Sequence, residues 1–187
     1  LTAAGYSGGP FNITCNFDAA DVDAGATPSR FVIRRHTSGT WTVTNTSPRT
    51  ATSTRATGLT AFSDFSVGEQ AIDHYDVTAT SPQLAGSVFT TTVTARDVLN
   101  ELVVDDNTTS VTMTSSGAAE FDSDGNATFG DNAKTLTAGT FGIATRDGTA
   151  ETISLTATDT NAKTGSRTGL VIQAALSIST SSLPNGM

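Results

Sequence analysis

One acidic stretch carries the residue types and spacing best suited to metal chemistry in this chain. Asp122, Asp124 and Asn126 alternate along it, and Asp131 follows shortly after. Hard cations such as Ca²⁺ take about six to eight oxygen ligands, and this spacing matches the first half of a calcium-binding loop. The acid that would complete such a loop is replaced by Ala133. The stretch therefore predicts either a calcium site or an Asp/Gly-rich hairpin turn, and no other cofactor is expected.

The residues that commonly carry catalysis are sparse. His36 and His74 are the two histidines, and neither has a Cys or Glu at a zinc-ligand spacing. The chain lacks a Gly-x-Ser-x-Gly nucleophile motif. With one Trp and two Tyr, it offers few aromatic rings to line a sugar cleft around paired carboxylates. We therefore expect no enzymatic activity.

Two aromatic residues are candidates for ligand binding. Trp41 and Tyr6 could present rings on which a sugar stacks, whereas a Trp on a hairpin more often anchors a core. Cys15 is the one cysteine, so no intramolecular disulfide can form. It lies in an alternating run and is expected to be a small buried hydrophobe.

The charge balance argues against nucleic acid and membrane partners. The net charge is −8 and the sequence pI is about 4.5, with Lys134 and Lys163 as the two lysines. No basic patch is available to neutralise phosphates or anionic lipids. No apolar run approaches the length of about 18 residues that spans a bilayer, so membrane insertion is not expected.

The apolar residues alternate with polar ones, which is typical of half-buried strands. In residues 136–159, Phe141 and Ile143 share one face of a run, and Ile153 and Leu155 share one face of the next. Asp-Gly between the runs is a strong turn signal, so this stretch predicts a β-hairpin. No sustained helical period occurs. The chain is therefore expected to be all-β, with little or no helix.

The first part of the chain has too few predicted strands for a free-standing sandwich, which usually has about seven. The patterns predict a strand at residues 11–17, a hairpin at residues 31–45 turning at Ser38-Gly39, and one short run at residues 56–65. We interpret residues 1–69 as a partial or strand-complemented β-sandwich module. Strand exchange between subunits is a specific expectation of this interpretation.

The remainder predicts a complete sandwich at residues 70–173, because short strands alternate with turn signals. The expected strands are residues 75–80, 88–96, 110–115, 126–129, 134–136, 140–145, 151–158 and 168–172. Residues 174–187 are interpreted as the start of a following module or a linker strand. The expected fold class is therefore Ig-like antiparallel β-sandwich domains in tandem.

The order of several phrases resembles the bacterial Ig-like repeats of invasin and intimin type over about residues 72–173. These phrases are FTTTVTARD, NTTSVTMT, AEFD, KTLTAG and AETISLTATD. The resemblance implies an Ig-like fold in tandem repeats of long bacterial surface proteins. It implies a spacer, adhesive or assembly role and no chemistry, because fold alone does not determine function.

Together these patterns predict a non-catalytic structural module of a secreted or cell-surface protein. It would act as a stalk or spacer, or as the subunit of a self-assembling filament, with other copies of the same protein or neighbouring modules as partners. The alternative is an adhesin or carbohydrate-binding module that recognises surface glycans through Trp41 and Tyr6.

Overall fold

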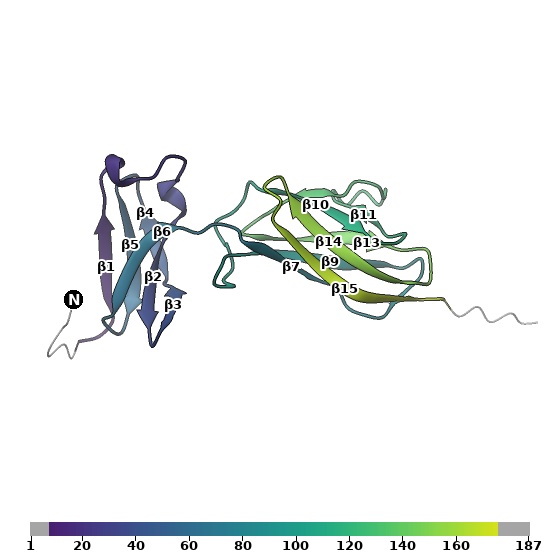
Figure 1. Cartoon of the computed structure of the whole chain (residues 1–187), viewed down its shortest axis with the longest axis horizontal. Helices are drawn as coiled ribbons and strands as arrows, with labels where there is room; N and C mark the ends of the chain where they lie inside the picture. The colour runs from purple at the N-terminus through teal and green to yellow at the C-terminus, as the bar shows by residue number, and fades with distance from the viewer. Residues whose placement is uncertain (1–7, 176–187) are drawn as a thin grey trace, which may run out of the picture. The chain divides into compact units, whose positions relative to one another are not determined.

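The computed structural model describes residues 8–175, and within that range the chain forms β-strands and two short 3-10 turns (Figure 1). The predicted all-β fold is confirmed. The chain divides into two compact units. The first unit comprises Leu1–His74 and Ala95–Asp106, and the second comprises Tyr75–Thr94 and Asn107–Met187. The chain therefore passes from one unit to the other three times. The module boundaries expected at residues 69/70 and 173/174 stay predictions.

The first unit is a sandwich of two three-stranded sheets, in the orders β1-β5-β4 and β3-β2-β6. Its strands are β1 (Phe11–Asn16), β2 (Phe31–Thr37), β3 (Thr40–Val43), β4 (Thr46–Arg49), β5 (Ser53–Leu59) and β6 (Asp64–Glu69). The 3-10 turns η1 (Ala19–Asp21) and η2 (Pro28–Arg30) lie between β1 and β2. All the pairings are antiparallel.

The predicted hairpin of the first unit is confirmed. Strands β2 and β3 pair with Arg34 opposite Val43. The turn residues Ser38 and Gly39 both have positive φ, 51° and 87°, as a two-residue type I′ turn requires. The single run expected at residues 56–65 is wrong. It contains the end of β5, a connection, and the start of β6.

The core of the first unit is small. Ile33, Ala56 and Leu59 are its fully buried cluster. Four partly buried residues pack against this cluster: Phe11, Ile13, Cys15 and Phe65. Because both sheets contribute, this cluster holds the two layers together. Cys15 is half-buried rather than enclosed, and burial raises the pKa of its thiol.

The second unit has two larger sheets, in the orders β11-β13-β9-β7 and β12-β10-β14-β15-β8. Its strands are β7 (His74–Thr78), β8 (Gln83–Leu84), β9 (Val88–Arg96), β10 (Ser110–Ser115), β11 (Glu120–Asp122), β12 (Ala133–Thr135), β13 (Thr140–Arg146), β14 (Thr152–Asp159) and β15 (Thr164–Gln173). The first sheet has the neighbour relations of strands D, E, B and A of an Ig domain. The second has those of C′, C, F and G, with β8 added in parallel to β15.

Two expectations for the second unit are wrong. Strands β13 and β14 do not form a hairpin, because they belong to opposite sheets and residues 147–151 cross between the layers. The alternation of apolar and polar residues identifies the core-facing side of a strand but not the strand with which it pairs. The strand expected at residues 126–129 is also wrong. Those residues lie in the loop after β11, a strand that the sequence patterns missed because only three residues form it.

The two sheets of the second unit approach closely where β7 meets β15. A Cβ added at Gly165 would lie 1.8 Å from the carbonyl oxygen of Tyr75, so glycine is required there. The hydroxyl of the buried Tyr75 donates to Asp159 at 2.8 Å. The contact at Gly165 brings the first and last strands of the sandwich together, and the hydrogen bond links β7 to β14.

Candidate functional site

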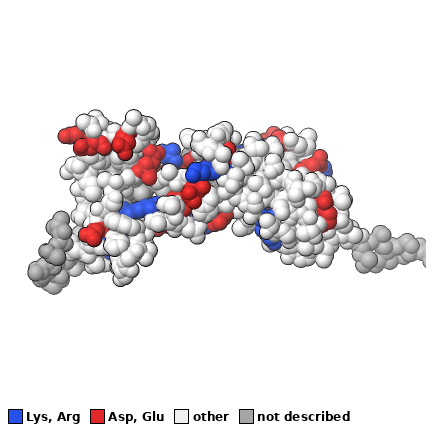
Figure 2. Space-filling model, viewed as in Figure 1, with Lys and Arg blue, Asp and Glu red and all other residues white. Residues whose placement is uncertain are grey.

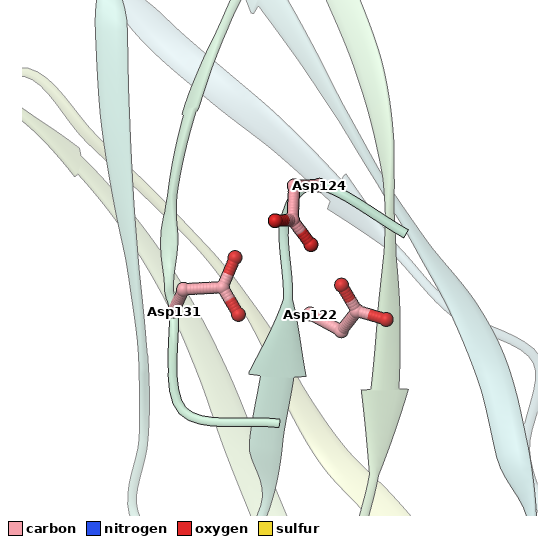
Figure 3. A group of neighbouring side chains, drawn as sticks. All are labelled: Asp122, Asp124 and Asp131. Carbon is pink, nitrogen blue, oxygen red and sulfur yellow. The ribbon is translucent and has the colours of Figure 1, made fainter. Parts of the chain in front are cut away.

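The acidic stretch forms a compact cluster of carboxylates in the second unit. Asp122 ends β11, and a single parallel bridge places Asp131 beside it. One carboxylate oxygen from each of Asp122, Asp124 and Asp131 lies within 4.8 Å of the others. Figure 3 shows these three side chains facing a common space. The structure therefore brings together the three acids that the sequence selected.

The same carboxylates organise the loop that carries them. Asp122 accepts hydrogen bonds from the backbone amides of Gly125 and Ala127, at 2.7 and 2.8 Å. Asp131 accepts from the amide of Ser123 at 3.0 Å and also from its hydroxyl. The predicted hairpin-turn role is thus visible in these side chain–backbone bonds.

Asn126 also bonds within the loop. Its side-chain amide nitrogen donates to Asp124 at 2.9 Å, and its side-chain oxygen accepts from the amide of Thr128 at 2.6 Å. A role for Asn126 as a metal ligand stays a prediction.

Hydrogen bonding lowers the pKa of two acids of the cluster, Asp122 and Asp131. Partial desolvation acts to raise the pKa of Asp122, but the bonds from Gly125 and Ala127 outweigh it and the pKa lies below its usual value. The hydroxyl and amide of Ser123 likewise lower the pKa of Asp131. A converging set of carboxylates suits a hard cation such as Ca²⁺. Three acids supply fewer than the about six to eight oxygens that Ca²⁺ takes, so water or loop carbonyls would complete the set. Calcium binding stays a prediction.

The expected sugar-binding residues are not placed together by the described part of the chain. Trp41 on β3 is half-buried and lies against the ring of His36, with 5.0 Å between the ring centroids. Tyr6 lies outside the described residues. A role for either ring in ligand binding stays a prediction.

The two histidines have separate surroundings in the first unit. His36 Nδ1 lies 3.9 Å from the carboxylate of Asp64. His74 lies 3.1 Å from Asp73 through Nδ1 and 3.2 Å from the side-chain oxygen of Asn100 through Nε2. Each histidine thus contacts its own surface acid.

The sequence patterns missed a set of ion pairs that binds the returning segment Ala95–Asp106 into the first unit. Arg34 pairs with Asp97, whose side chain is buried. Two further pairs connect Arg49 with Asp105 at 2.7 Å and Arg30 with Asp106 at 3.1 Å. The carboxylate of Glu101 accepts from the amide of Val43 on β3 at 3.0 Å.

Asp97 is the centre of this set. One carboxylate oxygen accepts from the amides of Leu99 and Glu101, at 2.8 and 3.0 Å. The other accepts from Arg34 and from the side chain of Gln70, the latter at 2.8 Å. Burial acts to raise the pKa of Asp97, but these donors together hold it below its usual value. A buried, ionised and fully bonded acid of this kind fixes structure.

Asp159 makes the same turn in the second unit. Its carboxylate accepts from the amides of Asn161 and Lys163, both near 2.9 Å. The third residue after each aspartate has positive φ, 62° at Asn100 and 59° at Ala162. The sequence signal was an Asp at the end of an alternating run in both places. The sequence does not predict the turn after Asp159, because Ala162 is not a residue type that favours positive φ.

Basic and acidic side chains are mixed on the face of the molecule that Figure 2 shows. Where the structure describes the chain, no helix is long and apolar enough to span a membrane.

Comparisons with known proteins add little. No family model and no curated protein matches the chain. Among solved structures it is similar to a beta-glycosidase from Bacteroides vulgatus, at 11% identity and a TM-score of 0.42. That match covers 89% of this chain, which spans 25% of the glycosidase chain. It is also similar to the Clostridium thermocellum CbhA fibronectin(III)-like modules, at 13% identity and a TM-score of 0.29, covering 89% of this chain and 87% of that one.

At these identities and TM-scores neither similarity carries an argument about activity. The β-sandwich assignment rests on the sheet order and pairing of the chain itself. That order supports an Ig-like fold, whereas membership of the invasin and intimin type stays a prediction.

Proposed function

We propose that this chain is a non-catalytic spacer in a bacterial secreted or cell-surface protein, where it carries tension along a stalk. The observation that carries the proposal is the interleaving of the two units along the chain. Ala95–Asp106 belongs to the first unit. The segment of residues 75–94, which belongs to the second unit, is therefore connected to the first unit at both of its ends. Buried ion pairing at Asp97 resists withdrawal of the segment.

Stretching the whole chain from its two ends tests this proposal. If the second unit unfolds first, the loop of residues 75–94 stays closed by the first unit and is shielded from the force. Unfolding of the second unit should then lengthen the chain by about 70 Å less than full extension of all its residues would. The difference comes from residues 75–94, at about 3.5 Å for each residue. Single-molecule force spectroscopy measures this increment directly.

Two variants sharpen the measurement. Asp97→Ala should let the segment slide out and restore the missing length. Asp64→Ala should leave the short increment unchanged, because that side chain is 82% exposed. Gradual extension of the wild-type chain without a cooperative step would contradict a tension-carrying role.

Calcium binding is a separate prediction with its own test. If the Asp122 cluster holds Ca²⁺ in the folded state only, thermal melting should occur at a higher temperature with CaCl₂ than with chelator. Asp131→Asn should abolish the difference, since the amide oxygen can still accept from Ser123 while the charge is lost. Glu120→Gln, on the same strand as Asp122, is the matched control. Equal melting temperatures of the wild type with CaCl₂ and with chelator would show that the cluster does not bind Ca²⁺ in the folded state.

The alternative role as an adhesin or carbohydrate-binding module is tested through Trp41. Glycan binding should change the fluorescence of this single Trp if the alternative is right. Unchanged emission over a panel of surface glycans would remove Trp41 from the argument.

A further inference from the structure

One side of the first unit is an apolar groove between two edge strands. Among the described residues, strands β1 and β6 each have a sheet neighbour on one side only. The groove between them, here called the β1/β6 seam, has a volume of about 540 Å³. It is lined by β1 and by the start of β6 with the preceding residues: Ile13, Thr14, Cys15, Phe62, Ser63, Asp64 and Phe65.

Core-facing side chains of these two edge strands are left partly in water. Val67 on β6 lies opposite Ile33 on β2, so both point into the sandwich. Ile33 is fully buried, whereas Val67 is 36% exposed. The apolar residues of β1 are all only half-buried. In the second unit, by contrast, Leu170 and Ile172 on the last strand are buried.

The strand topology explains this exposure. An Ig sandwich has strands A, B, E and D in one sheet and C, F and G in the other. By their partners, β1, β5 and β4 occupy positions B, E and D, and β2 and β6 occupy C and F. Among the described residues no strand occupies position A or G of this unit, and both positions border the β1/β6 seam.

The chain covers the other edges of this unit itself. The edge strand β3 receives Glu101 at the amide of Val43, and β4 receives Asp105 at Arg49. Both acids belong to the returning segment Ala95–Asp106. The unit is therefore closed on the side of β3 and β4, while the β1/β6 seam keeps an apolar groove.

We propose that residues 176–180 of a second copy of this chain add to β6 at the β1/β6 seam and supply the missing strand G. Their sequence, LSIST, alternates apolar and polar side chains and carries no charge. Leu176 and Ile178 would enter the groove, and Ser177 and Ser179 would face water. This assembly goes beyond the spacer function and does not rest on it.

The chemistry of the groove fits an uncharged strand. Backbone groups along a sheet edge pair with an added strand, and its alternate side chains fill the apolar pocket. A strand of five residues spans about 17 Å, which suits the six-residue β6. Asp64 is the charged residue of the lining, and its 82% exposure lets it stay in water.

The single cysteine provides the test, because Cys15 lines the groove. Thiol labelling of the full chain would be followed from about 1 μM to about 500 μM protein, together with sedimentation velocity. We expect association at high concentration and labelling that becomes about tenfold slower, since the added strand must leave before Cys15 reacts.

Matched variants identify the segment and the acceptor. Leu176→Asp with Ile178→Asp should abolish both association and protection, while Ser177→Asp with Ser179→Asp, which adds the same charge on the other face, should keep them. On the acceptor side, Val67→Asp should weaken association and Ser66→Asp should not. Val67 and Ser66 are both exposed, so these variants should fold.

Three outcomes would overturn the proposal. The first is a monomer with unchanged labelling at every concentration. The second is protection that does not depend on concentration, which would assign the seam to a segment of the same chain. The third is association that survives the Leu176→Asp and Ile178→Asp pair, which would assign it to another surface.

Discussion

The two units of this chain differ in how each sandwich is closed where its first and last strands meet. In the second unit, β7 and β15 approach so closely at Gly165 that no Cβ fits, and Tyr75 bonds to Asp159 across the layers. In the first unit, the corresponding side is the apolar groove beside β1 and β6. The strands described for the second unit bury its core, whereas those described for the first unit leave core-facing residues such as Val67 partly in water.

The first unit has a small apolar core and several ion pairs. Its fully buried cluster is three residues, and the returning segment adds several ion pairs around Asp97. The second unit depends instead on long runs of buried alternate residues along β9, β13 and β14. The comparison shows that the two units differ in their interactions: the first has a smaller apolar cluster and more ion pairs, and the second has longer runs of buried side chains.

The largest expected effect breaks the closure of the second unit. Gly165→Ala places a methyl group against the backbone of Tyr75, so we expect a loss of about 4 kcal/mol in the free energy of unfolding. Gly68→Ala on β6 is the matched control, because its Cβ would meet nothing within 4 Å. Hydrogen exchange of β7 and β15 measures the loss, and equal protection in both variants would show that this closure is not a close contact.

The second effect breaks the electrostatic closure of the first unit. Asp97→Ala leaves Arg34 without its buried partner and should cost about 3 kcal/mol in the free energy of unfolding. Trp41 fluorescence during denaturation reports this unit. The folded pKa of Asp97 is lowered, so its contribution is present above the unfolded pKa of about 3.9 and is lost as pH falls through the folded pKa. The cost of Asp97→Ala should therefore shrink in acid, and a cost independent of pH would contradict the ionic account.

The smallest expected effect concerns a buried acid of the second unit, Asp147. Asp147 is buried in the crossing between β13 and β14, and one of its carboxylate oxygens has no hydrogen-bond partner. Burial raises the pKa of Asp147, and the nearby Glu151 adds to this, against a hydrogen bond from the amide of Thr149. Asp147→Asn should therefore stabilise the second unit by about 1 kcal/mol at neutral pH.

The sign of that gain follows from the raised pKa. Ionised Asp147 costs stability above the folded pKa, and the cost vanishes below the unfolded value of about 3.9. Melting curves of wild type and Asp147→Asn should thus differ at neutral pH and coincide in strong acid. Asp64→Asn, at an exposed position, should show no such difference. Destabilisation by Asp147→Asn would mean that the charge is needed where it lies.

The sequence by itself determined the strand content, the core-facing sides of the strands and the clustering of three aspartates in the acidic loop. Alternation places Phe141, Ile143, Ile153 and Leu155 in the core, and all four are buried. The spacing of Asp122, Asp124 and Asp131 was enough to predict that they meet, because local loop geometry brings them together. The Ser38-Gly39 turn was likewise predictable from residues that tolerate positive φ.

Tertiary structure alone decided which strands pair and which sides of each sandwich are closed. Residues 136–159 have the local pattern of a hairpin, yet β13 and β14 separate into opposite sheets because each finds its partners far along the chain. The ion pairs of Asp97 join residues 63 positions apart, a distance at which local patterns carry no information. The β1/β6 seam is likewise a property of strand order, because periodicity identifies the face a side chain occupies and not whether another strand covers it.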